Sequence, residues 1–125
     1  MSDINSFEDL DVWKRGCQLA VDVCVATDDS KFYGLKDQMQ RSAISIPSNI
    51  AEGSERDSSA DFLRFLRYSK VSCGELRTQL YISERVRKEL GQPSLRNSSE
   101  MISETRQLSK MLQSLINSLK RRLKP

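Results

Sequence analysis

Apolar residues recur along the chain at spacings of three and four, and this periodicity constrains the fold more than any other feature. The clearest run alternates steps of four and three through Phe62, Leu66, Ser69, Cys73, Leu76 and Leu80. Such a heptad seam is typical of helices in a left-handed bundle. Five glycines and three prolines among 125 residues leave few breaks for a many-stranded β fold. The sequence therefore predicts an all-α protein.

Turn signals divide this pattern into four helices within one domain, residues 1–125. The predicted helices span about 10–27, 33–52, 59–90 and 98–123. Ser58 and Asn97 each begin a segment that resembles a capping box, which marks the start of a helix. Because the connections are short, we expect consecutive helices to pack antiparallel, as an up-down-up-down four-helix bundle.

Two of the predicted helices carry apolar residues on a second face. In the first helix one face holds Leu10, Trp13, Cys17, Ala20, Val21 and Cys24, and the other holds Val12, Leu19, Val23 and Ala26. In the third helix the second face holds Tyr68, Val71, Ile82 and Val86. A second apolar face indicates either an oligomer interface or a helix buried deeply in its own domain. For the interface we select Val12, Leu19, Val23, Tyr68, Val71, Ile82 and Val86.

Charge is distributed unevenly along the chain. Residues 1–62 hold 6 Lys/Arg and 12 Asp/Glu, a net charge of −6, whereas residues 63–125 hold 14 and 5, a net charge of +9. The basic half could attract phosphate. It could equally pair with the acidic half, within one subunit or between copies.

Two basic clusters are candidate nucleic-acid-binding residues. Five cations of the third helix share an arc of about 80°, and Tyr81, which could stack on an unpaired base, lies in the same arc. These cations are Arg67, Lys70, Arg77, Arg85 and Lys88. The second cluster is Lys120, Arg121, Arg122 and Lys124 at the C-terminus. The alternatives are a solvated face and a soluble helix end. Glu75 is a lesser candidate, as a partner for Arg41 or Arg56 across the bundle.

Composition argues against most enzyme classes. The chain contains no histidine, which removes histidine triads and His-ligated metals, and it has no Walker A or G-x-S-x-G segment. We expect no catalysis and no cofactor or metal. Three cysteines, no apolar run of membrane-spanning length and no signal peptide indicate a cytoplasmic protein with reduced thiols.

Three segments are distinctive: FEDLDVW at 7–13, YGLKDQMQRSAISIPSNIAEGSER at 33–56 and DFLRFLRYSKVSCGEL at 61–76. Over about residues 7–119 the chain resembles the four-helix-bundle proteins encoded in intervening sequences of bacterial 23S ribosomal RNA. The resemblance implies a left-handed bundle, a homopentameric ring and no enzymatic activity. Wider relatives include the accessory protein of diversity-generating retroelements, which is thought to bind nucleic acid and a reverse transcriptase.

The family's recurrent segment maps onto a polar stripe of the second helix. Its members are Gln38, Arg41, Ser45, Asn49 and Glu52. They could line a subunit interface, a ring channel or a ligand surface; alternatively, Asn49 and Glu52 simply stabilise a kink at Pro47 and the turn that follows it. Overall we expect a homo-oligomer that binds RNA or DNA through a basic surface. The alternative is a protein-interaction scaffold whose charge asymmetry serves self-assembly.

Overall fold

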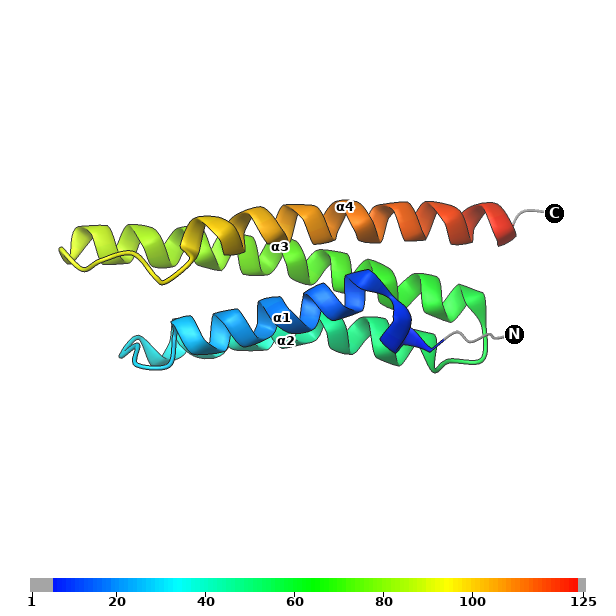
Figure 1. Ribbon diagram of the computed structural model, residues 1–125, viewed down its shortest axis with the longest axis horizontal. Helices are drawn as coiled ribbons and strands as arrows, with labels where there is room; N and C mark the ends of the chain where they lie inside the picture. The colour runs from blue at the N-terminus through cyan, green and yellow to red at the C-terminus, as the bar shows by residue number, and fades with distance from the viewer. Residues whose placement is uncertain (1–5, 124–125) are drawn as a thin grey trace.

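Four long helices and one short 3₁₀ helix make up residues 6–123, the part of the chain that the computed structural model describes (Figure 1). They are η1 (Phe7–Asp9), α1 (Asp11–Ala26), α2 (Tyr33–Ser54), α3 (Ser59–Glu89) and α4 (Ser98–Leu123). Over these residues the fold is all-α, as expected, with no strand. Each end of the four long helices lies within two residues of its expected position.

Each long helix packs against two others. α1 contacts α2 and α4, and α3 contacts the same two helices, whereas neither diagonal pair is in contact within residues 6–123. Figure 1 shows the α1–α2 and α3–α4 connections at one end of the molecule and the α2–α3 connection at the other. The helices therefore enclose one common core. Among residues 6–123, no helix is long and apolar enough to cross a membrane.

The two expected capping segments have different outcomes. The Ser58 hydroxyl accepts a hydrogen bond from the Asp61 N–H at 3.0 Å, which is the bond expected of an N-cap residue. Asn97 instead adopts a left-handed conformation with φ 59°. An N-cap residue has an extended backbone, so the predicted capping box at Asn97 is wrong.

The α2–α3 contact is close because small and polar residues line it. The Ser69 hydroxyl donates to the carbonyl oxygen of Ile46 at 2.8 Å, and the hydroxyls of Ser45 and Ser72 lie 2.5 Å apart. At the end of α2, a Cβ on Gly53 would lie only 2.6 Å from the Cβ of Phe65. The heptad seam of α3 is thus buried against α2 where its side chains are smallest.

The choice of oligomer-interface residues on α1 is wrong. Val12, Leu19 and Val23 are 5%, 2% and 0% exposed, so they belong to the core of the single chain. The outer face of α1 instead carries Val21 and Val25, both more than half exposed. Two apolar faces look alike in sequence, and only the contacts of α1 with both α2 and α4 decide which of them is covered.

On α3 the selected residues stay accessible. Tyr68, Val71 and Ile82 are 45%, 62% and 47% exposed, and Val86 is half-buried. A subunit contact through these residues stays a prediction.

Gly53→Ala should destabilise the protein because its new methyl group has no room beside Phe65. We expect a loss of about 1–3 kcal/mol in the free energy of unfolding, the usual range for overpacking. The measurement is urea unfolding at fixed protein concentration. Gly34→Ala is the matched control, because a Cβ there meets nothing within 4 Å. Equal stabilities of the two variants would contradict the close α2–α3 contact.

Cys73 should be the least reactive thiol of the native protein. Its side chain is buried on α3, and desolvation raises the pKa of the thiol to about 12. The reactive thiolate is therefore scarce at about pH 8.5. Iodoacetamide labelling followed by mass spectrometry should modify Cys73 far more slowly than Cys24, with the difference abolished in denaturant. Comparable native rates at the two positions would show that Cys73 is not buried as described.

Candidate nucleic-acid interface

A groove between α3 and α4 brings three cations of the α3 stripe beside one of the C-terminal cluster. It has a volume of about 420 Å³. The residues that line it are Arg67, Lys70, Val71, Gly74 and Arg77 of α3 and Ser109, Gln113, Ile116 and Lys120 of α4. We call it the basic groove, because four of these side chains are cations and none is a carboxylate. Lys120 thus joins the α3 stripe across a helix–helix boundary.

Hydrogen bonds between the helices hold one end of the basic groove. The Arg77 Nε–H donates to the Thr105 hydroxyl at 3.0 Å, and that hydroxyl donates in turn to the Ile102 carbonyl at 2.6 Å. One turn further along α3, Arg106 donates to the Tyr81 hydroxyl at 2.6 Å. These bonds fix α4 beside the cations of α3. The Tyr81 ring remains 43% exposed, just beyond the residues that line the groove.

A second groove, between α1 and α4, has the opposite charge. Its lining includes Asp22, Glu100 and Glu104, together with polar and apolar residues. Glu104 accepts two hydrogen bonds from Arg15 of α1, at 2.8 and 2.5 Å. This bidentate contact raises the pKa of the Arg15 guanidinium. α4 therefore separates an acidic groove from the basic one.

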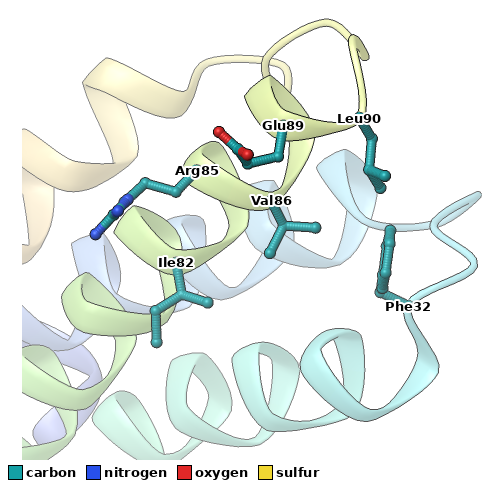
Figure 2. A pocket seen from close by; sticks show the side chains of 6 residues that line it. All are labelled: Phe32, Ile82, Arg85, Val86, Glu89 and Leu90. Atoms are coloured by element: carbon teal, nitrogen blue, oxygen red, sulfur yellow. The ribbon is translucent and has the colours of Figure 1, made fainter.

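An apolar pocket lies near the end of α3 (Figure 2). It is lined by Phe32, Ile82, Arg85, Val86, Glu89 and Leu90 and has a volume of about 470 Å³. Phe32 is the residue that precedes α2. Figure 2 shows its ring opposite Val86 and Leu90, with the guanidinium of Arg85 extending away from the ring. Arg85 belongs to this pocket and Lys88 is exposed outside both hollows. The predicted α3 stripe is thus split between two sites.

Two further members of the C-terminal cluster lie outside the basic groove. Arg121 and Arg122 are exposed at the end of α4. Lys124 lies outside the described residues.

The polar stripe of α2 is also divided. Ser45 and Asn49 are half-buried, and the Asn49 amide donates to the Ser45 carbonyl at 2.9 Å beside the Ser45–Ser72 contact. Gln38, Arg41 and Glu52 are exposed. The inner members therefore help to hold α3, and the outer members face solvent.

The suggested partners of Glu75 are wrong. Arg41 pairs with Asp37 at 2.8 Å within α2, and Arg56, two residues beyond the end of α2, pairs with Glu52 at 2.9 Å. Glu75 is exposed on α3. An ion pair at i, i+4 on one helix needs no tertiary alignment, which favours it over a pair across the bundle.

Sequence reasoning missed half of the basic groove. Ser109, Gln113 and Ile116 carry no distinctive motif, and they line the groove only because α4 packs beside α3 in this register. Gly74 was visible as a small residue in the middle of α3, but its position on the groove floor depends on the same packing. Nothing in the sequence indicated that Phe32 and Leu90 would line the same pocket.

Comparisons with known proteins agree with this architecture. The family model described as 23S rRNA-intervening sequence protein matches residues 8–114. A Bacteroides thetaiotaomicron crystal structure, described as a protein of unknown function from the S23 ribosomal protein family, is similar with a TM-score of 0.74 and 22% identity. The alignment covers 84% of this chain and 97% of that one. No curated protein matches the chain.

At 22% identity, the likeness to this crystal structure shows a shared fold. The family match bears on the sequence, and it spans all but the ends of the chain. The chain therefore belongs to the 23S rRNA-intervening sequence protein family.

Proposed function

We propose that this protein is a non-enzymatic nucleic-acid-binding bundle and that the basic groove is its binding surface. The observation that carries the proposal is the meeting of Arg67, Lys70, Arg77 and Lys120 in one hollow without a lining carboxylate. Cations grouped on two walls of a groove create a positive potential that attracts phosphate. A merely solvated face needs no such convergence of two distant sequence segments.

The length of the cationic row suits the sugar–phosphate backbone of a nucleic acid better than a single small anion. Arg67 and Arg77 are ten residues apart on α3, which corresponds to about 15 Å along the helix axis. Lys120 faces this row from α4. Several phosphates of one strand can therefore be contacted together, and each contact releases counterions and makes binding depend on salt.

Assembly would strengthen a weak site of this kind. We propose that left-handed up-down-up-down bundles form a closed ring, a homopentamer as the family resemblance implies. Exposed apolar side chains of α3, among them Tyr68 and Ile82, offer surface for subunit contacts. Several copies that bind one strand would raise the apparent affinity by a factor of ~10²–10⁴ where the geometry permits simultaneous contact.

A specific observation also favours the second candidate, a self-assembling protein-interaction scaffold. The acidic α1–α4 groove, with Asp22 and Glu100, could dock against the basic groove of another copy. In that arrangement assembly would consume the cations and would weaken at high salt. Nucleic-acid binding and charge-driven assembly therefore make opposite demands on the same surface.

Charge reversal in the basic groove should abolish most nucleic-acid binding. The double variant Arg67→Glu/Lys120→Glu changes one exposed cation on each wall and leaves the Arg77–Thr105 bond in place. Fluorescence anisotropy with single-stranded and duplex oligonucleotides at ~50 and ~200 mM salt measures the affinity and its salt dependence. We expect at least about a tenfold loss at low salt and a salt slope shallower by about 1 for each lost contact.

The matched control is Lys88→Glu/Lys110→Glu. It makes the same change in net charge, again with one exposed residue on each of α3 and α4, but outside the basic groove. An equal loss in both double variants would indicate attraction by net charge alone and would exclude the groove. Absence of binding by the unmodified protein at low salt, with its oligomer intact, would favour the scaffold.

A further inference from the structure

Gly74 has no structural reason to be a glycine. It lies in the middle of the 31-residue helix α3 and is exposed, and a Cβ added to it would meet nothing within 4 Å. Its φ lies outside the left-handed region that favours glycine, since only Gly91 among the described glycines has a positive φ. A glycine inside a helix lowers stability relative to alanine. The bundle accordingly forgoes stability here without gaining close packing or a turn.

The basic groove supplies the missing reason. Gly74 lines this groove, with Lys70 and Arg67 one and two turns before it and Arg77 one turn after it on the same helix. Val71 also lines the groove and is 62% exposed, whereas Ile116 of α4, which is 2% exposed, belongs to the core. The absence of a side chain at position 74 leaves space in the groove, and Val71 gives that space an exposed apolar neighbour.

We propose that the floor at Gly74 receives an unpaired base, so that the basic groove selects single-stranded nucleic acid over duplex. This inference rests on the proposed function and names its ligand class. Phosphates before and after the base would contact the cations on the two walls, and the flat face of the base would cover Val71. Grooves that bind single strands usually combine a cationic track with aromatic side chains on which bases stack. In the basic groove the exposed aliphatic side chain of Val71 would take the place of the aromatic one.

A duplex would leave this floor without an occupant. Its bases are paired and stacked inside, so that it presents phosphates and sugars outward and would contact only the walls of the groove. The α4 wall also carries Ser109 and Gln113, whose hydroxyl and amide can bond to the edges of an unpaired base. The Gln113 amide is already oriented, because one of its N–H groups donates to Asn117 at 2.9 Å.

The test fills the floor without changing a charge. Gly74→Leu should fold normally, since the position is open, but its side chain should occupy the space of the base. Gly74→Ala should retain binding and stabilise the helix, and Gly34→Leu is the control because it places leucine at another exposed, open glycine. Circular dichroism and thermal unfolding confirm that all three variants fold.

The probes separate the base from the backbone. They are an oligothymidine strand of about 12 nucleotides, an abasic strand of the same length, the corresponding duplex, and an oligouridine strand that distinguishes RNA from DNA as the source. Fluorescence anisotropy should show that the unmodified protein prefers oligothymidine to both the abasic strand and the duplex. Gly74→Leu should weaken oligothymidine binding by about tenfold, the effect of losing one stacked base, and leave abasic binding unchanged.

The possible failures are distinguishable. If Gly74→Leu binds oligothymidine as tightly as the unmodified protein, or loses the abasic strand to the same degree, the base site is wrong although the basic groove still binds phosphate. If the unmodified protein binds duplex and single strand equally, the selection is wrong. If it binds no strand at all, the proposed function fails and the base site fails with it.

Discussion

The hydrogen bond from the Ser69 hydroxyl to the Ile46 carbonyl joins α2 and α3 at the centre of the bundle. This bond requires the two helices to approach closely. They are also close near the end of α2, where a Cβ on Gly53 would have no room beside Phe65 of α3. This contact fixes the rotation of α3 about its axis. Gly74 lies five positions after Ser69, which places the two about 140° apart around the helix. Anchoring Ser69 toward α2 therefore turns Gly74 and the cations around it toward α4 and solvent.

α4 then completes the surface that α3 begins. Hydrogen bonds from Arg77 to Thr105 and from Arg106 to Tyr81 hold the two helices side by side, and Lys120 lies on the far wall of the resulting groove. The other side of α4 pairs Glu104 with Arg15 of α1. One helix thus contributes to an acidic groove on one side, through Glu100 and Glu104, and to the basic groove on the other, through Lys120.

Spacing alone predicted the features that depend on one helix at a time. The four helices, the buried seam from Leu66 to Leu80 and the alignment of Arg67 with Arg77 all follow from 3.6-residue periodicity. Features that depend on which helices meet were not accessible in this way. The apolar faces of α1 could not be ranked, because burial of Val23 depends on where α2 and α4 pack.

The candidate site shows the same division between local and tertiary information. The cations of α3 could be predicted from the sequence. Their separation into two sites could not, because α4 forms one wall of the basic groove and Phe32 forms part of the apolar pocket. The significance of Gly74 is likewise a tertiary property. A glycine in a helix becomes informative only when the structure shows that neither close packing nor backbone conformation requires it.

Lysine footprinting on the unmodified protein tests the central claim most directly. Lys70 and Lys120 line the basic groove, whereas Lys88 and Lys110 are exposed outside it on the same two helices. Acetylation rates measured by mass spectrometry should fall at Lys70 and Lys120 when a single-stranded oligonucleotide is added, and should not change at Lys88 and Lys110. Unchanged rates at Lys70 and Lys120, or equal protection of all four lysines, would contradict a nucleic-acid site in this groove.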